Sequence, residues 1–320
     1  MIAQVLTGML ATSMVAGLCL GGVSTPRETD ATATQDAAVE EASPPLPQTD
    51  EATQSVDSAV EEATDEVTAE RRRRLINDAV EALDETHNAL KALDEGDTEA
   101  ALESLAIATG KLDLVVSRNP RLALAPIDVR LVTHDLYATA ESVQAAKKKA
   151  LEHLQDGRLQ DARALIEGLR SDVVVEVVNV PLATYPAAIK AITPLIDDDR
   201  IKEARASLQS AINTLVVTQN IHPLPIIRTE QMLSRAEELA TTEERTDEQN
   251  EELDRLLEGS RRQLEFAQTL GYGEEDDFEG YYKQLDEIVR KTSDGKSGTG
   301  FFDKIRRALS SFGNSDSRAN

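Results

Sequence analysis

Aromatic residues and cysteine are what this chain of 320 residues has least of. Phe and Tyr make up 3% of it, Trp is absent, and Cys19 is its one cysteine. Any hydrophobic core is therefore expected to consist of Leu, Ile, Val and Ala, which suits helices that pack closely on one another. A single cysteine cannot form a disulfide within the chain, so cysteine pairing gives no indication of the redox compartment.

Basic residues are also few. The chain has 58 Asp and Glu residues against 34 Lys and Arg residues, which gives a formal net charge of −24 at pH 7. Proteins that bind nucleic acid need a basic surface, because the phosphates must be neutralised. The composition therefore excludes nucleic acid as an expected partner.

Catalytic and metal-binding motifs are missing. The four histidines are too dispersed for a metal-ligand spacing, and the chain has no GxSxG and no HExxH sequence. Gly295-Lys296-Ser297 resembles the end of a phosphate-binding loop, but Arg290 stands where that motif needs a glycine. We therefore predict no catalytic residue, no metal site and no cofactor, and we expect that the protein is not an enzyme.

Residues 1–24 form an apolar segment without charge, which is typical of an export signal. Gly22-Val23-Ser24 supplies the small residues that a cleavage site needs. A cleaved signal predicts export to the periplasm. Lipidation at Cys19 and retention of the segment as a membrane anchor stay open as alternatives.

Residues 25–69 are expected to be a disordered acidic linker. Thirteen acidic residues and no basic one lie between Glu28 and Glu70. Such a segment repels itself and offers too little apolar surface to offset the entropy of ordering. We therefore expect the folded domain to survive removal of residues 1–69. Arg71–Arg74 would then form the first turn of a helix that runs to Glu95.

The central part of the chain repeats itself after 42 residues. The shift carries Asp161-Ala162-Arg163 onto Glu203-Ala204-Arg205, and Val174-Val175 onto Val216-Val217. Each copy is predicted to be two helices around a tight turn, followed by a β-branched run that a proline ends. Residues 70–292 are therefore predicted to form a mainly α domain, an irregular array of antiparallel helical hairpins.

Two segments could add a small two-stranded β element. Between Ile127 and Leu131 apolar residues alternate with Asp128 and Arg130, which predicts a short strand. The segment Asp172–Val178 has five valines in seven residues and is the candidate partner strand. A continuing buried helix stays open as the alternative for residues 172–178.

Residues 293–320 are predicted to be a Gly/Ser loop and a C-terminal amphipathic helix. One side of this helix carries Phe301, Phe302, Ile305, Leu309 and Phe312. Such a face suits either a membrane surface or a docking site on the chain itself, because so short a helix is marginal alone in water. We favour docking on the chain itself.

One group of polar and aromatic residues lies in or beside the proline-rich connections. It consists of Tyr137, Asn179, Tyr185, Asn220 and His222. If the fold brings these residues together, they would line a pocket for a small molecule. Tyr185 alone could instead be a buried anchor for the next helix.

The proline-bounded segments resemble the YfdX family of bacterial exported proteins. The residues that carry the resemblance include EGDTEAALESLAIATGKLDL at 95–114, NVPLATYP at 179–186 and NIHPLPIIR at 220–228. It covers roughly Leu75 to Leu309. The resemblance implies a mainly helical fold, an export signal, and an association with stress and acid tolerance. It implies no reaction, cofactor or catalytic residue.

These observations together favour a non-enzymatic exported stress-response protein with a binding or chaperone-like role. The alternative is a small-molecule-binding protein with a pocket among the proline-rich connections. A homo-oligomer is expected, with unfolded client proteins or a small molecule as partners. Contact with a membrane is expected only through the N-terminal segment or the C-terminal helix.

Overall fold

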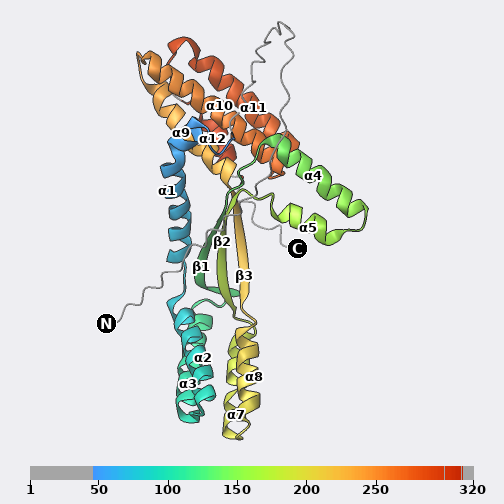
Figure 1. The fold of residues 1–320 in the computed structure, drawn as a ribbon. Helices are drawn as coiled ribbons and strands as arrows, with labels where there is room; N and C mark the ends of the chain where they lie inside the picture. Colours follow the sequence, from blue (N-terminus) through green and yellow to red (C-terminus); the bar gives the residue numbers. More distant parts are fainter. Residues whose placement is uncertain (1–45, 299, 311, 313–320) are drawn as a thin grey trace, which may run out of the picture. The chain divides into compact units, whose positions relative to one another are not determined.

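The computed structural model describes residues 46–298, 300–310 and 312. It confirms the mainly helical fold (Figure 1). The elements are α1 (Glu51–Arg73), α2 (Asn77–Glu95), α3 (Thr98–Arg118), β1 (Leu124–His134), α4 (Ala140–Gln155), α5 (Leu159–Glu167), β2 (Asp172–Pro181), α6 (Tyr185–Lys190), α7 (Thr193–Asp197), α8 (Ile201–Ile212), β3 (Val216–Pro223), α9 (Leu224–Thr241), α10 (Asp247–Leu270), α11 (Glu275–Thr292), the 3-10 turn η1 (Ser293–Gly295) and α12 (Asp303–Ser310). The predicted leader with Cys19, and the linker up to residue 45, lie outside the described residues. Among the described helices none is both long and apolar enough to cross a membrane.

The strands form one antiparallel sheet in the order β1-β2-β3. Asp172 pairs with His134 on one side and with Pro223 on the other, and the opposite end of β2 pairs Pro181 with Leu124. The predicted strands over Ile127–Leu131 and Asp172–Val178 are confirmed. The expectation of two strands was too low, because the second copy of the 42-residue repeat supplies β3. Its β-branched run pairs with that of the first copy along most of its length.

One hydrophobic core lies at the Pro181 end of the sheet. It joins α2 and α3 with α6, α7 and α8, and its apolar side chains include Leu105, Leu112, Tyr185, Ile189 and Leu208. The α2–α3 pair is a helical hairpin, and Gly96 ends α2 in the left-handed conformation that favours glycine.

A second core lies at the Asp172 end of the sheet. There α9 and α10 form a further hairpin, which packs with α1, α11 and α12. The side chains of Met232, Leu233, Leu253, Leu264 and Phe278 are almost fully buried in it. The start of α10 is fixed by a capping box, in which the Thr246 side chain accepts from the backbone of Gln249 and the Gln249 side chain accepts from that of Thr246.

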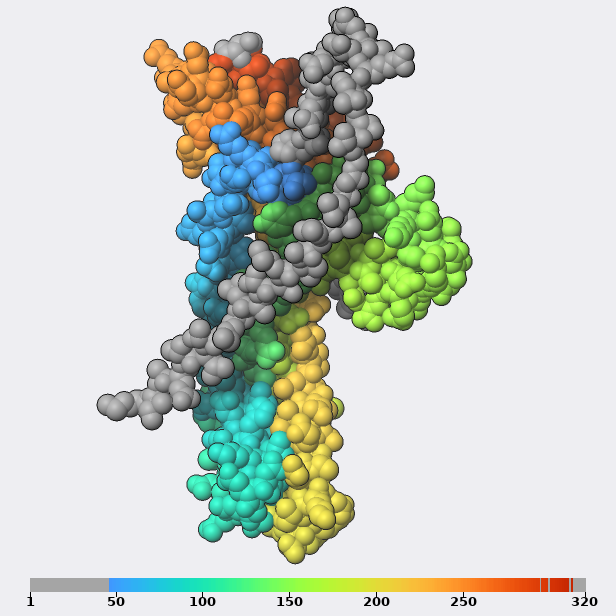
Figure 2. All heavy atoms as spheres, in the orientation of Figure 1, coloured from blue at the N-terminus to red at the C-terminus, as the bar shows by residue number. Residues whose placement is uncertain are grey.

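The hairpin of α4 and α5 differs from the others because it shares little core with the rest. The two helices pack mainly on each other, and α4 also contacts α10. Only Val143, Ala150 and Ala162 of the two helices are buried. In the space-filling view the light-green atoms of this hairpin form a lobe of their own (Figure 2).

The prediction of a disordered linker up to residue 69 is wrong for its second half. Residues 51–73 form helix α1, whose small side chains Ala52, Thr53, Val56, Val60 and Thr68 are buried. Its lower part covers one face of the sheet, where Val67 packs beside Val129, Val175 and Val177. The acidic residues lie mostly on the outer side of α1, so a narrow stripe of small residues was enough to dock it.

The arginine run therefore has a different place from the one predicted. Arg71–Arg73 form the last turn of α1, and the next helix begins only at Asn77. Positive charge at a helix C-terminus is favourable to the helix dipole, whereas the predicted first-turn position would be unfavourable. The arginines thus stabilise the last turn of α1.

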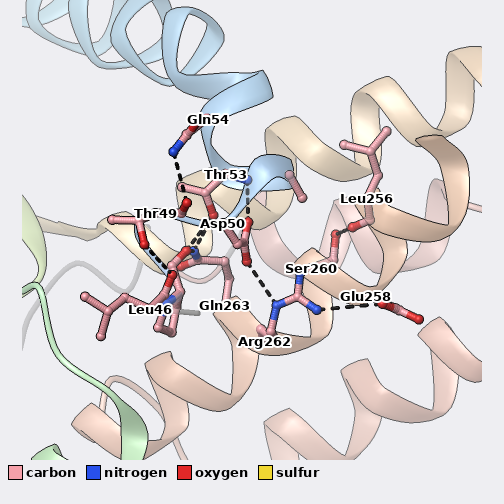
Figure 3. A network of polar contacts seen from close by, with 12 residues as sticks. Leu46, Thr49, Asp50, Thr53, Gln54, Leu256, Glu258, Ser260, Arg262 and Gln263 are labelled. Carbon is pink, nitrogen blue, oxygen red and sulfur yellow. Dashed lines mark hydrogen bonds and ion pairs between the residues drawn. The ribbon is translucent and has the colours of Figure 1, made fainter. Parts of the chain in front are cut away.

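A polar network fastens the beginning of α1 to α10 (Figure 3). Asp50 accepts from the backbone N–H of Thr53 at 2.7 Å and from Nε of Arg262 at 3.0 Å. Gln263 donates from Nε2 to the carbonyl of Pro47 at 2.6 Å and to Oγ1 of Thr53 at 2.9 Å. Asp50, Thr53 and Gln263 are buried from water, so loss of any partner would leave a buried polar group without a hydrogen bond.

The C-terminal helix docks on the chain itself. Phe302, Ile305 and Leu309 are each no more than 1% exposed, and Phe301 and Phe312 pack partly buried beside them. The helix contacts α9 and α11. Its apolar face is thus occupied within the chain and is not presented to a membrane in this structure.

Candidate functional site

The residues predicted to line a pocket do not converge. His222 lies six positions along β3 from Val216, the partner of Asn179, which is about 20 Å at 3.3 Å per residue. Tyr137 is 64% exposed beyond the other strand, β1. Asn220 points to the same face as His222, and Tyr185 lies in the core at the Pro181 end. The structure therefore does not form the predicted pocket from these residues.

Asn179 and His222 instead take part in the structure of the sheet. The side chain of Asn179 donates from Nδ2 to the carbonyl of Val177 at 2.8 Å, to that of Val216 at 3.2 Å and to Oγ1 of Thr218 at 3.2 Å. It thereby ties β2 to β3. Burial, together with the positive charge of Arg71, lowers the pKa of His222, so the neutral imidazole is favoured there.

Tyr185 is the buried anchor of α6. Its side chain is 0% exposed, and burial raises the pKa of its phenol. The hydroxyl points toward Thr86, but Oγ1 of Thr86 donates to the carbonyl of Ala82 at 2.7 Å. Within the described part of the chain the phenol oxygen has no hydrogen bond of normal geometry. Its contribution is therefore that of a large ring in the core.

Truncation at this position tests the assignment. Tyr185→Ala is expected to lower the free energy of unfolding by about 3–5 kcal/mol, as for other fully buried aromatic rings, because it leaves a cavity. Tyr185→Phe keeps the ring and is expected to cost nothing, since the hydroxyl makes no bond there. Urea unfolding followed by circular dichroism measures both. A loss below about 0.5 kcal/mol for Tyr185→Ala would contradict the anchor and restore the pocket.

A buried polar cluster that the sequence did not predict lies at the Asp172 end of the sheet. Arg228 of α9 forms a two-pronged ion pair with Asp135 at 2.7 and 3.1 Å. Asp172 accepts from Nδ1 of His134 and from the hydroxyl of Tyr272, each at 3.0 Å. Burial raises the pKa of Tyr272 well above its usual range, so the phenol keeps its proton.

The polar cluster links segments that lie far apart in the sequence. It joins the end of β1, the start of β2, α9 and the turn after α10, so only the folded chain reveals it. Asp172 orients the His134 ring, as in catalytic dyads, but the residues around it line neither of the two surface hollows described next. In the part of the chain that the structure describes, no three His, Cys, Asp or Glu side chains are placed to share a metal ion.

The structure has a hollow of about 520 Å³ between α9 and α12. It is lined by Glu230, Gln231, Ser234, Asp303, Arg306, Arg307 and Ser310. Burial raises the pKa of the Glu230 carboxyl to about 7, although the nearby Arg306 guanidinium acts in the opposite direction. A second hollow, of about 420 Å³, lies beside Glu66, Val67, Glu70, Arg73 and Arg74. Both are open to solvent and mix acidic with basic side chains.

The α4–α5 hairpin carries four large apolar side chains that are more than two-fifths exposed. Leu151, Leu154, Leu159 and Ile166 are 54%, 44%, 61% and 50% exposed. We call these four residues the hairpin surface. Residues 140–167 contain five acidic and five basic residues, so the hairpin is neutral in a chain of net charge −24. The hairpin thus has exposed apolar side chains but no net negative charge that would repel acidic polypeptides, so it is suited to bind other polypeptides.

Comparison with known proteins gives a family model and solved structures that are similar to part of the chain. Residues 82–221 match the model of the family described as YfdX protein. A crystal structure of Salmonella Typhi YfdX is similar with a TM-score of 0.33 and 19% sequence identity, covering 47% of this chain and 93% of that one. No curated protein matches. The matched residues run from α2 to β3 and include the α4–α5 hairpin.

Proposed function

We propose that this chain, whose residues 82–221 match the YfdX family model, is a non-enzymatic binding protein that holds non-native polypeptides. The observation that carries this proposal is the hairpin surface, four large apolar side chains each at least 44% exposed on two helices with little core of their own. Exposed apolar segments of an unfolding client would bury such side chains and be kept from aggregating. The apolar, uncharged segment 1–24 supports export of the protein to the periplasm, and the resemblance to the YfdX family supports a role under stress.

The small-molecule alternative has less support. The five residues predicted for its pocket lie at opposite ends of the sheet or in the core. The hollow between α9 and α12 is open and lined mostly by charged and polar groups, whereas small-molecule pockets are mostly apolar and enclosed. We therefore assign the binding role to the hairpin surface.

The hairpin surface can be removed without disturbing the core. In the full chain, Leu154→Gln with Leu159→Gln is expected to abolish most of the suppression of light scattering from a chemically reduced, aggregating model client. The matched control is Ile107→Gln with Leu114→Gln, because these side chains of α3 are 42% and 44% exposed outside the hairpin. The control should protect the client as the unchanged chain does.

Thermal unfolding of each variant shows whether the fold is intact, since exposed substitutions usually change stability by less than about 0.5 kcal/mol. Equal protection by the hairpin variant and the unchanged chain, at equal thermal midpoints, would overturn the proposal. Absence of protection by the unchanged chain at every client ratio would overturn it as well.

A further inference from the structure

β3 is an edge strand of the sheet, and within the described residues it carries neither a charged side chain nor an internal proline to hinder pairing. Its sequence, VVTQNIHP, has no charged residue, in a chain of which 29% is charged. Natural proteins block an exposed edge with lysine, internal proline, a bulge or a covering element. The proline of β3 stands at its last position, and Val217 and Ile221 are 52% and 47% exposed. An uncharged edge of this kind is suited to accept another strand.

The hydrogen-bond pattern shows which backbone groups of β3 point outward. The N–H of Leu224 donates to the carbonyl of Ser171 at 3.0 Å, in register with the ladder that pairs Asp172 with Pro223. In an antiparallel ladder the backbone N–H and C=O groups of successive residues point alternately to one side of the strand and to the other. Counting back from Leu224, the backbone groups of every second residue therefore point to β2, and those of the residues in between point away from it. The outward backbone groups are therefore those of Val217, Gln219 and Ile221.

We propose that β3 pairs antiparallel with β3 of a second copy of this chain, on a two-fold axis at Gln219. In that register each outward residue donates one backbone hydrogen bond to the second copy and accepts one from it. Val217 lies opposite Ile221 of the second copy, and Gln219 lies opposite its own equivalent. The two three-stranded sheets then form one continuous sheet across the axis.

The side chains of the edge are complementary to themselves. The outward residues have an apolar, polar, apolar order, so the antiparallel two-fold brings apolar side chains against each other at both ends. A partner of different sequence has no such reason to match in this direction. The sequence of β3 therefore favours a second copy of this chain as the partner.

The charge of the chain does not oppose this contact locally. On the sheet face that carries Val217 and Ile221, Glu176 accepts a hydrogen bond from Nε2 of Gln219 at 2.8 Å. On the same face Arg130 forms an ion pair with Asp128 at 3.0 Å. Charges farther away are screened over about 8 Å at physiological salt. The inference does not rest on the proposed function, because the hairpin surface takes no part in it.

Sedimentation velocity of the full chain tests the pairing. The unchanged chain is expected to sediment with twice the monomer mass, or a multiple of it, at tens of micromolar. Val217→Lys with Ile221→Lys places two like charges on each edge and is expected to give monomers. The matched control is Val132→Lys. Val132 is an exposed valine of β1, the strand at the opposite edge of the sheet, and its side chain lies on the same sheet face as Val217 and Ile221, so this variant should leave the mass unchanged.

A cysteine scan tests the register. In a Cys19→Ser background, Gln219→Cys places two thiols on the two-fold axis, where Cα atoms about 5.5 Å apart allow a disulfide. Mild oxidation is expected to give a covalent dimer from this variant and none from Thr218→Cys, whose side chain points to the opposite face. A monomeric unchanged chain at 100 µM, or equal cross-linking of both variants, would overturn the proposal. Loss of assembly in the hairpin variant alone would also overturn it.

Discussion

A chain that starts at Leu75 is expected to unfold at least about 10 °C below a chain that starts at Leu46, because it lacks the apolar area that α1 buries. Val56 and Val60 are 2% and 8% exposed, and burial of each stabilises the fold by roughly 1.5–3 kcal/mol. Removing α1 also uncovers apolar side chains of α9, α10 and the sheet, so the total loss is about 5 kcal/mol or more. Each kcal/mol lowers the midpoint of a domain of this size by about 2–4 °C.

A single substitution tests the same docking without a truncation. A Cβ atom at Gly259 of α10 would lie 2.6 Å from Cβ of Ala52 and 3.0 Å from Sδ of Met232, so Gly259→Val forces α1 away from α10. Gly280→Val in α11 is the matched control, because a Cβ atom there meets nothing within 4 Å. Differential scanning calorimetry should show a large drop for the first variant only. Equal midpoints for the two chain starts would show that α1 is not part of the core.

Glu230→Gln is expected to stabilise the protein at pH 8 by about 2–3 kcal/mol and to have little effect at pH 4.5. Burial raises the pKa of this carboxyl from 4.5 to about 7 in the folded chain. Between these values the folded chain binds more protons than the unfolded chain, so the stability held below pH 4.5 is lost as the pH rises through 7. A difference of about 2.5 pKa units corresponds to roughly 3 kcal/mol at 1.36 kcal/mol per unit.

The neighbours of Glu230 explain why the pKa of its carboxyl is raised. Burial raises the pKa of Tyr281 in α11, and the charges of Asp277 and Glu230 raise it further. Arg306 of α12 only partly favours the Glu230 carboxylate, because it also forms an ion pair with Glu237. Glu279→Gln is the control, since Lys283 holds the pKa of that exposed carboxyl below its usual value. Urea unfolding between pH 4.5 and 8 measures the linkage. A Glu230→Gln gain that is the same at every pH would contradict it.

Most of the helices could be predicted from local signals. The two helices of the α9–α10 hairpin, and the break between α2 and α3 at Gly96, follow from apolar spacing and turn residues in the sequence itself. The alternation at Ile127–Leu131 and the valine run at Asp172–Val178 predicted two of the three strands, β1 and β2, in the same way. These signals are local, because each depends on residues within a few positions of one another.

The docking of α1 could not be predicted in this way. Its buried stripe consists of Ala, Thr and Val among many carboxylates, so composition indicated disorder. What decided the outcome is the complementary surface on α10, where Gly259 leaves room for Ala52 and where Arg262 and Gln263 meet Asp50 and Thr53. These partners lie more than 200 positions away in the sequence.

By itself the sequence determined the helical class, the repeat that yields β2 and β3, and the family resemblance. Only the tertiary structure decided that the predicted pocket residues lie apart, that Glu230 lies beside α12 with a raised pKa, and that Asp135 pairs with Arg228. The physical reason is that burial and long-range pairing depend on how whole elements pack. Periodicity shows which side of a helix is apolar, but it does not show which surface will cover that side.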